Sequence, residues 1–260
     1  NNSHLHILSM KEFGGGIRYT EIDSVGNILI NALEVPTIYD DLGGIYFGAT
    51  IAVDQQGHPH ICYRRHLGDW YYHLYYIYRT DSGWSDNKRI AAHVQRGNVV
   101  RMDIDGNDRV HIIHSSLNDS LWGSVTYYQI QNGEVIGNLT QDISNPRNSE
   151  DILFRLDNRF EIEASYDGDV HIVLGCPFQK YGKITYFYSP DHGESFIKWG
   201  HLHSPDCLRR NGDPDVFLDQ TGDIHFCYGT NNDDALDNEP TLRYLRMSDQ
   251  HVIEEHNVVN

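Results

Sequence analysis

One short phrase recurs along this chain of 260 residues and limits what it can fold into. Its clearest copies run from Asp54 to Tyr63 and from Asp219 to Tyr228, and each reads as a tight turn that leads into a strand containing a histidine. When looser copies and a first copy that lacks the turn are counted, the repeated histidines are His6, His60, His111, His171 and His225. Self-similarity at a period near 50 residues predicts a propeller or another repeat array.

A second signature follows each histidine: an apolar residue, one spacer and a tyrosine. These tyrosines are Tyr19, Tyr76, Tyr127, Tyr186 and Tyr244. Each unit then contains an inner strand, a His strand, a Tyr strand and an outer strand. Five such units predict an all-β fold, a five-bladed β-propeller of four-stranded antiparallel blades, with a linear β array as the alternative. We expect a single domain with blades at residues 1–40, 44–93, 97–143, 157–202 and 213–260.

The first unit lacks a visible inner strand, because the sequence enters it at the His strand. The segment after Leu242 is shorter than the stretch that leads from the Tyr strand to the next inner strand in the other units. It is therefore not expected to supply the missing strand. Residues removed from this sequence, a three-stranded first blade and a partner that fills the gap are the alternatives. In the last case the protein would be a homo-oligomer. An unfilled gap would expose strand edges, which proteins usually avoid.

Charge and hydropathy exclude several classes of partner. The chain has 20 basic and 37 acidic residues, a net charge of −17, so nucleic acid and anionic membrane surfaces are not expected to bind. No apolar run approaches the roughly 18–20 residues of a membrane span. The sequence has no initiator methionine and no signal peptide, which suggests a processed or trimmed start. Two glycosylation-type triplets, at Asn118 and Asn138, are the basis for expecting an extracytoplasmic or secreted protein.

The four cysteines do not form a disulfide scaffold. Cys62 and Cys227 occupy the same place in two repeats, so both are expected to be small core residues. Cys176 and Cys207 flank the outer half of the fourth unit, and a disulfide between them is the less favoured alternative.

The recurrent histidine is expected to be structural rather than catalytic. Asp54, Asp105 and Asp219 each stand six residues before their histidine, at the start of the turn. This spacing predicts a hydrogen bond from the histidine to the aspartate or to the backbone in every blade.

The inner strands show an alternation when they are aligned on the histidine. Three positions before the histidine are apolar in all four units that have an inner strand. They are Val53, Ile104, Ala164 and Leu218 at seven residues before it, Ile51, Met102, Ile162 and Val216 at nine, and Ala49, Val100, Phe160 and Pro214 at eleven. Since side chains alternate between the two faces of a strand, this set should share one face and pack between blades.

The intervening positions carry mixed side chains that are expected to line the central channel. They include Thr50, Arg101, Asp103, Arg159, Glu161, Glu163, Asp213 and Asp215. Crowded carboxylates repel one another and burial penalises their charged form, so at least one should have a raised pKa. Two carboxyl groups with separated pKa values can serve as acid and base, or as acid and nucleophile. The alternative is that ion pairs between blades, such as Arg101 with Glu161, satisfy these charges.

The loops that join one blade to the next supply further candidates for ligand binding. They are Tyr39, Asp40, Tyr46, Arg96, Arg155, Trp199, His201, His203, Arg209 and Arg210. Aromatic faces and guanidinium forks suit sugars and carboxylates, although each residue alone reads as an ordinary loop position.

No cofactor and no metal are expected. The acidic spacing from Asp103 to Asp108 resembles a calcium loop but lacks the bidentate glutamate. Three His-x-His pairs occur, at residues 4 and 6, 58 and 60, and 201 and 203. With 16 histidines in the chain, coincidence is favoured over a zinc site. The sequence contains neither a glycine-rich phosphate loop nor a nucleophile elbow.

The stretch from Ser189 to Phe196 matches the Asp-box of bacterial neuraminidase repeats, Ser-x-Asp-x-Gly-x-x-aromatic, and residues 80–84 look like a degenerate copy. Together with the histidine phrase, this box makes the chain resemble the sialidase-like propeller superfamily over nearly its whole length. Such propellers include sialidases, polysaccharide lyases and lectins. Sialidases have six blades and an arginine triad with a Tyr–Glu pair, which this sequence does not show, so sialidase activity is not expected.

The favoured hypothesis is a carbohydrate-active enzyme of the glycoside hydrolase or polysaccharide lyase type, with one central acidic site. Glu161 and Asp215 would be the acid and the base or nucleophile, with Asp103 and Arg101 tuning or binding, a placement that resembles five-bladed glycoside hydrolases. Substrate contacts are expected from Thr50, Glu163, Asp213, Arg159, Tyr46, Arg96, Arg155, Trp199, His201 and Arg209. A glycan-binding lectin and a protein-interaction scaffold are the alternatives. One site is favoured over five, because the channel and rim residues differ in every unit.

Overall fold

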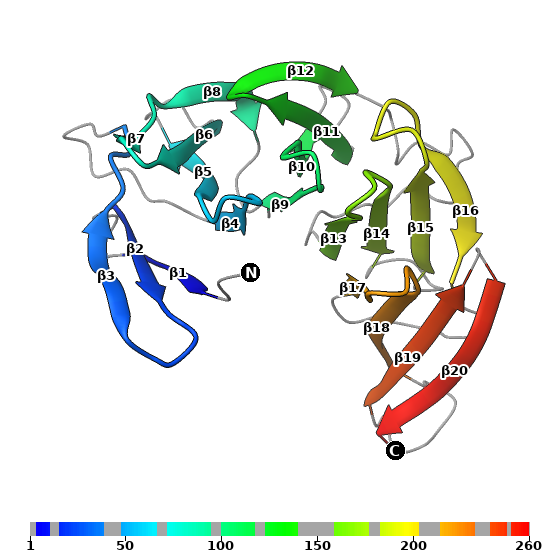
Figure 1. Ribbon diagram of the computed structural model, residues 1–260. Helices are drawn as coiled ribbons and strands as arrows, with labels where there is room; N and C mark the ends of the chain where they lie inside the picture. Colours follow the sequence, from blue (N-terminus) through cyan, green and yellow to red (C-terminus); the bar gives the residue numbers. More distant parts are fainter. Residues whose placement is uncertain are drawn as a thin grey trace. The chain divides into compact units, whose positions relative to one another are not determined.

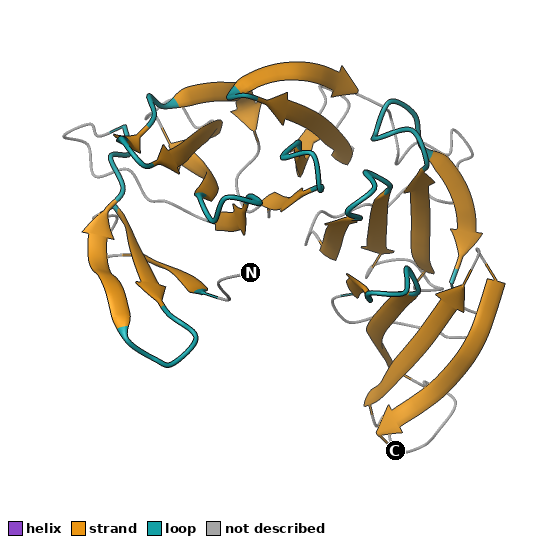
Figure 2. Cartoon of the chain, in the orientation of Figure 1, coloured by secondary structure: helices purple, strands orange, loops and turns teal. Residues whose placement is uncertain are grey.

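The computed structural model describes most of the repeated units. The described residues are 4–10, 16–38, 48–66, 72–94, 100–117, 123–139, 159–176, 183–202, 214–231, 240–248 and 251–259. Their regular structure is β-strand throughout, and none of them belongs to a helix that could cross a membrane (Figure 2). The all-β prediction is therefore confirmed.

The strands form five antiparallel sheets, one for each predicted unit (Figure 1). The first blade contains β1 (Leu5–Met10), β2 (Ile17–Ile22) and β3 (Ile28–Glu34). The second contains β4 (Ala49–Val53), β5 (Pro59–His66), β6 (Tyr72–Thr80), β7 (Gly83–Trp84) and β8 (Lys88–Val94). The third contains β9 (Val100–Ile104), β10 (Val110–Leu117), β11 (Gly123–Gln131) and β12 (Glu134–Leu139).

The fourth blade contains β13 (Arg159–Ala164), β14 (Val170–Cys176), β15 (Lys183–Ser189) and β16 (Ile197–His201). The fifth contains β17 (Asp215–Leu218), β18 (Ile224–Asn231), β19 (Pro240–Ser248) and β20 (His251–Val259). Strands pair in chain order within each blade, except that both β7 and β8 pair with β6. This is the fold class of a five-bladed β-propeller, and the predicted lack of an inner strand holds for the described part of the first blade.

Contacts divide the chain into two compact units. Residues 1–116 and 127–138 form the first unit, and residues 117–126 and 139–260 form the second. Each unit is described separately below, and the prediction of a single domain stays a prediction.

The predicted apolar face of the inner strands packs between blades. In the first unit, Val100 and Met102 of β9 join one core cluster with Cys62 and Leu74 of the second blade. In the second unit, Val216 of β17 joins a cluster with residues of β14 and β15. The third and fifth blades therefore bury this face against the preceding blade of their unit, and apolar burial of this kind is the main stabilising term.

The repeated histidine is bonded to the repeated tyrosine in all five blades. The Nδ1–Oη distances are 2.7 Å in the first blade, 2.5 Å in the second, 2.6 Å in the third, 2.7 Å in the fourth and 2.7 Å in the fifth. The structural role predicted for the histidine is thereby confirmed. Its constant partner, the tyrosine of the second signature, was not predicted, and the bond joins the His strand to the Tyr strand.

The aspartate of the turn completes the arrangement in three blades. His60, His111 and His225 lie 3.3, 3.3 and 3.0 Å from the Oδ2 atoms of their turn aspartates. An Nε2–H that donates to the carboxylate leaves Nδ1 of a neutral ring as an acceptor for the tyrosine hydroxyl. The other aspartate oxygen accepts backbone N–H bonds within the turn, as at Asp54 and Asp219. One carboxylate thus fixes both the turn and the imidazole.

The stretch from Ser189 to Phe196 that resembles an Asp-box, here called the Asp-box turn, connects β15 to β16. Asp191 Oδ1 accepts a hydrogen bond from Ser189 Oγ at 2.7 Å and another from the Ser195 backbone at 2.9 Å, while Gly193 N donates to Ser189 Oγ at 2.7 Å. Gly168, with φ of 95°, lies against this turn, and a Cβ built on it would meet the His192 ring at 1.9 Å. Only glycine fits there, so the turn between β15 and β16 packs against the turn between β13 and β14 of the same blade.

The two repeated cysteines differ in their surroundings. Cys62 is fully buried, as expected, whereas Cys227 is only partly buried, so its prediction as a core residue is wrong. Both cysteines lie on the opposite strand face from their two neighbours, but the face that carries Cys62 packs against the third blade, whereas no described blade of the second unit follows the fifth and covers Cys227. Cys207 and the side chain of Cys176 lie outside the described residues, so their disulfide stays untested.

Removing one tyrosine hydroxyl should show what the repeated bond contributes. Tyr186 is fully buried and bonded to His171, so Tyr186→Phe leaves a buried imidazole nitrogen without its partner. We expect urea unfolding to show a loss of about 1–3 kcal/mol. Tyr166→Phe is the matched control, because Tyr166 is 73% exposed in a turn of the same blade. Equal stability of the two variants would contradict a structural role for the bond.

The fourth blade should make stability depend on pH. Burial lowers the pKa of His171 from 6.5 to about 4. The folded state therefore binds fewer protons than the unfolded state between these values. This stabilisation is present above pH 6.5 and is lost as the pH falls toward 4, by about 3 kcal/mol in all. Unfolding free energies measured across this range for the wild type and for His171→Gln should differ in slope, and parallel curves would contradict the prediction.

Candidate functional site

In the second unit, the inner strands β13 and β17 lie side by side (Figure 1). Along β13, Glu161 and Glu163 are half-buried and alternate with the buried Phe160 and Ile162. Along β17, the exposed Asp215 precedes the buried Val216. The predicted alternation therefore holds on both strands, and it brings three carboxylates to neighbouring inner strands.

The two principal carboxylates do not face each other: Glu161 faces the fifth blade, whereas Asp215 faces away from the fourth. Glu161 lies opposite Val173 in the strand pairing, and Val173 packs in the same core cluster as Val216. Glu161 therefore lies on the face of the fourth blade that meets the fifth, whereas Asp215 lies on the opposite face of β17 from Val216. Both strands are the inner edges of their sheets, so the two carboxylates share that edge rather than one interface.

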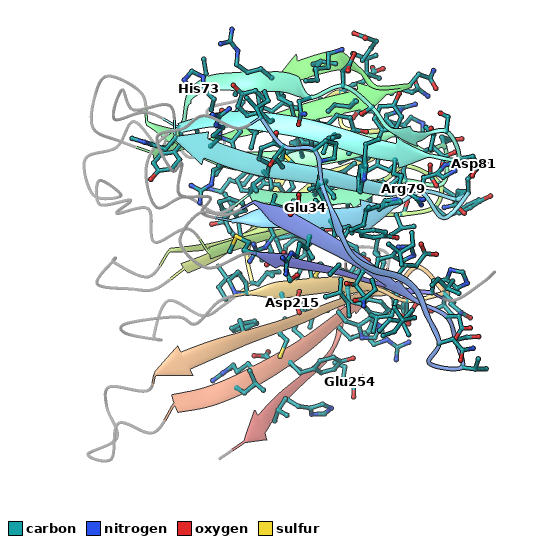
Figure 3. All side chains as sticks on the ribbon, turned by 90° about the vertical axis from the view of Figure 1, so that its left-hand side faces the viewer. Glu34, His73, Arg79, Asp81, Asp215 and Glu254 are labelled. Carbon is teal, nitrogen blue, oxygen red and sulfur yellow. The ribbon has the colours of Figure 1, made fainter. Side chains whose placement is uncertain are left out.

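Asp215 lies at the start of β17, where Figure 3 labels its side chain. Its Oδ1 accepts a hydrogen bond from the Val216 backbone at 3.0 Å. Its strand partner is Cys227. Burial raises the pKa of the Cys227 thiol, and the negative charge of Asp215 raises it further. An exposed carboxylate that keeps its second oxygen for other partners is chemically suited to act as a base or nucleophile.

In the first unit, the inner strands β4 and β9 also lie side by side. They carry Thr50, Arg101 and Asp103, all half-buried. Arg101 Nη1 lies 3.4 Å from the Val100 carbonyl, and Asp103 is the strand partner of His111. These residues belong to a different unit from Glu161, so the predicted ion pair of Arg101 with Glu161 stays a prediction.

One inner-strand position serves packing instead of a channel. Ala52 is equivalent to Asp103 and Glu163, and it packs against the core cluster formed with the third blade. Ala52 shares a sheet face with Cys62, which also belongs to that cluster. In the second blade, the positions with mixed side chains therefore face the following blade.

The loop candidates fall mostly outside the described residues. Trp199 is described, and its placement in a loop is wrong: it lies on β16, the outer strand of its blade. Its ring is 6.2 Å from the Tyr186 ring and packs on a core cluster. This location gives Trp199 a packing contact, and its role in binding stays a prediction. The residues outside the described set are Tyr39, Asp40, Tyr46, Arg96, Arg155, His203, Arg209, Arg210 and Asp213, together with the side chains of Arg159 and His201.

A cluster built around two buried arginines in the second blade was not predicted. We call Arg64, Arg65, His66, Tyr72 and His73 the basic cluster. It occupies the end of β5 and the facing start of β6, where Arg65 pairs with His73 and His66 pairs with Tyr72. Arg64, Arg65 and His73 are 3%, 1% and 5% exposed. Burying two adjacent arginines is unusual in a chain of net charge −17, so this end of the blade is a second candidate for binding a polar ligand.

Arg64 is held by the residues around it. Its guanidinium carbon lies 5.8 Å from the centre of the Tyr72 ring, a cation–π contact. Burial lowers the pKa of Arg64 to about 10, which leaves the side chain protonated at neutral pH. The sequence does contain a signal for the basic cluster: β5 is unlike the other His strands in ending on Arg-Arg-His.

The described side chains offer no metal centre. No group of three or more His, Cys, Asp or Glu side chains among them could hold a metal ion. Asp105, in the calcium-like stretch, is fully buried and accepts hydrogen bonds from the backbones of Asn107 and Arg109 as well as its contact with His111. Its oxygens are therefore used by the turn.

No protein-family model and no curated protein sequence matches the chain. Solved structures do share its fold. A protein of unknown function from Dyadobacter fermentans matches with a TM-score of 0.58 at 13% identity, over 85% of this chain and 71% of that one. The polysaccharide lyase Uly1 matches with a TM-score of 0.56 at 10% identity, over 94% and 55%. The K499G mutant of NanB sialidase from Streptococcus pneumoniae matches with 0.53 at 10% identity, over 99% and 61%.

These similarities show the propeller fold alone. The chain spans less than two thirds of the lyase and the sialidase that it matches. Their identities are too low to carry an activity or a set of site residues across.

Gly48 gives a test of whether the basic cluster is rigid. Gly48 has φ of 74°, and a Cβ built on it would lie 3.1 Å from Arg64 Nη2. Gly57 has φ of 86° with no atom within 4 Å of such a Cβ, so Gly57→Ala is a matched control. Both variants should lose about 1–2 kcal/mol of unfolding free energy through backbone strain. Gly48→Ala should lose more, and equal losses would show that Arg64 can move aside.

Proposed function

We propose that this protein is a carbohydrate-active enzyme of the glycoside hydrolase or polysaccharide lyase type. The observation that carries the proposal is the pair of neighbouring inner strands in the second unit, which presents Glu161, Glu163 and Asp215 at one edge. A half-buried carboxyl group on one inner strand and an exposed one on the neighbouring inner strand supply the two environments that acid–base catalysis uses. Glu161 is the proposed acid, and Asp215 is the proposed base or nucleophile.

Arg101 and Asp103 are proposed to tune the catalytic carboxyl groups or to bind the substrate. Thr50 and Glu163 are proposed substrate contacts. The loop residues outside the described set and Trp199 remain candidates for contacts at the rim. The ligand is a carbohydrate or another small polar molecule, and the proposed location is extracytoplasmic or secreted. Similarity of fold to a sialidase and a polysaccharide lyase supports this class of ligand.

The basic cluster favours an acidic polysaccharide among the possible substrates. Arginine pairs well with carboxylate and sulfate groups, because its fork of N–H donors matches their geometry. Arg65 shares its sheet face with His73, whereas Arg64 lies on the other face, so Arg65 with His73 is the pair proposed to bind such a group.

A glycan-binding lectin is the alternative, with a protein-interaction scaffold as the third possibility. A lectin that bound one ligand on each blade would repeat its ligand residues, and here the inner-strand residues differ between blades. Glycan-array binding without any product would favour the lectin.

Amide substitutions at the two proposed catalytic carboxylates test the enzyme. A panel of neutral and acidic polysaccharides is screened for new reducing ends and for the ultraviolet absorbance of an unsaturated product, which separates hydrolase from lyase. Glu161→Gln and Asp215→Asn should each reduce turnover roughly 100-fold or more. Glu194→Gln, on the exposed Asp-box turn of the same unit, is the matched control and should keep full activity. Full activity in both site variants would remove the assignment.

A further inference from the structure

The repeated turn of the third blade differs from its equivalents at one position. The last residue of this turn is glycine in the second, fourth and fifth blades, where Gly57, Gly168 and Gly222 have φ of 86°, 95° and 84°. Asp108 takes this position in the third blade, with φ of 56°. Its N–H donates to the Asp105 carbonyl at 3.1 Å, just as the glycine N–H does in the other turns. The turn therefore keeps its shape while a carboxylate replaces the hydrogen of glycine.

The backbone conformation of Asp108 is one that a residue with a side chain adopts at a cost. Glycine adopts it freely, and aspartate and asparagine are the residues that tolerate it next best. An outlier of this kind indicates that the surrounding structure holds the residue in place for another reason. The contacts of the carboxylate supply that reason.

The Asp108 carboxylate binds the turn of the preceding blade. Its Oδ1 accepts a hydrogen bond from the Gln55 backbone N–H at 2.8 Å, and its Oδ2 accepts one from Gln56 Nε2 at 3.0 Å. These two glutamines are the central residues of the second blade's own turn, which Gly57 closes by donating its N–H to the Asp54 carbonyl at 3.0 Å. Glycine at position 108 could make neither bond, so this contact belongs to the third blade's departure from the repeat.

The outer hairpins of the same two blades are also in polar contact. Lys88 Nζ, on β8, donates to the Gly133 carbonyl at 3.0 Å and forms an ion pair with Glu134. Gly133 has φ of 74°, and a Cβ built on it would lie 2.9 Å from the edge of the Tyr78 ring. Both hairpin turns of the third blade therefore lie against the second blade, in addition to the apolar core that the two blades share.

We propose that Asp108 is a clamp that makes the inner hairpins of the second and third blades, β4–β5 and β9–β10, open as one body. The contact of Lys88 with Gly133 does the same for the outer hairpins. Because β4 carries Thr50 and β9 carries Arg101, the clamp also fixes these two proposed ligand contacts relative to each other. That last consequence rests on the proposed function, whereas the clamp itself does not.

Amide hydrogen exchange of the full chain tests the clamp, because it measures the local opening of each hairpin. Asp108→Gly removes both acceptor oxygens and at the same time relieves the backbone strain. Since two hydrogen bonds to a carboxylate are lost, exchange should become roughly tenfold faster or more in residues 49–66 and 100–117. If Asp108 served only its own turn, glycine would leave the exchange unchanged or slow it.

Two further variants separate the clamp from the backbone effect of glycine. Asn132→Gly is the matched control, because Asn132 has φ of 52° in an exposed turn of the same blade. It should leave the exchange of the inner hairpins as in the wild type. Asp108→Asn keeps one acceptor oxygen and should exchange at a rate between those of the wild type and Asp108→Gly.

Gln55→Pro removes the backbone donor on the other side of the contact. Proline is favoured at the second position of such a turn, so the turn itself should form. Exchange in both inner hairpins should again become faster. The double variant with Asp108→Gly should exchange clearly more slowly than the product of the two single effects, because both changes remove the same bond. Thermal unfolding checks that each variant is folded.

Three results would overturn the proposal. The first is wild-type or slower exchange of the inner hairpins in Asp108→Gly. The second is a double variant whose effect equals the product of the single effects, which would show that the two positions act independently. The third is an equal acceleration in β14 and β18 of the second unit, since that result would show a general loss of stability. None of these results depends on catalytic activity, so the proposed enzyme can stand or fall separately.

Discussion

The hydrogen bond between the repeated histidine and the repeated tyrosine is the interaction on which each blade depends. It joins two neighbouring strands, at a buried point in the second, third and fourth blades and at a partly buried one in the first and fifth. In three blades the turn aspartate holds the same imidazole from its other side. A buried polar pair is costly to break, because each partner left alone keeps its desolvation penalty. These histidines are therefore occupied by structural hydrogen bonds and are unsuited to catalysis. Residues at other positions can then differ from blade to blade.

Strand alternation then divides the inner strands between packing and chemistry. One face is apolar on the described inner strands, and on β9 and β17 it is buried against the preceding blade of the same unit, as Met102 and Val216 show. The other face is not needed for that contact, so it can hold charged residues such as Glu161 and Asp103. Among the described strands, β1 has no inner neighbour, and Ile7 on it is 38% exposed whereas its equivalents in the other blades are at most 1% exposed.

Much of the fold could be predicted from the sequence because its repeats are governed by local rules. Turn residues and period-two alternation located the blades, although the tyrosine partner of the histidine needed the three-dimensional pairing of strands. The site was less predictable. Which face of a strand meets the next blade depends on tertiary packing, as Ala52 shows. The basic cluster was missed because consecutive charges such as Arg64 and Arg65 usually lie in solvent, and only the folded blade buries them.

The central claim is that a constant hydrogen-bonded framework carries a single ligand site on its variable inner strands. A crystal structure of the full chain with a bound oligosaccharide is the most direct measurement. The account predicts one ligand, in contact with inner strands and with Glu161 or Asp215. Ligands bound equivalently on the outer strands of several blades, with the inner strands unoccupied, would contradict it.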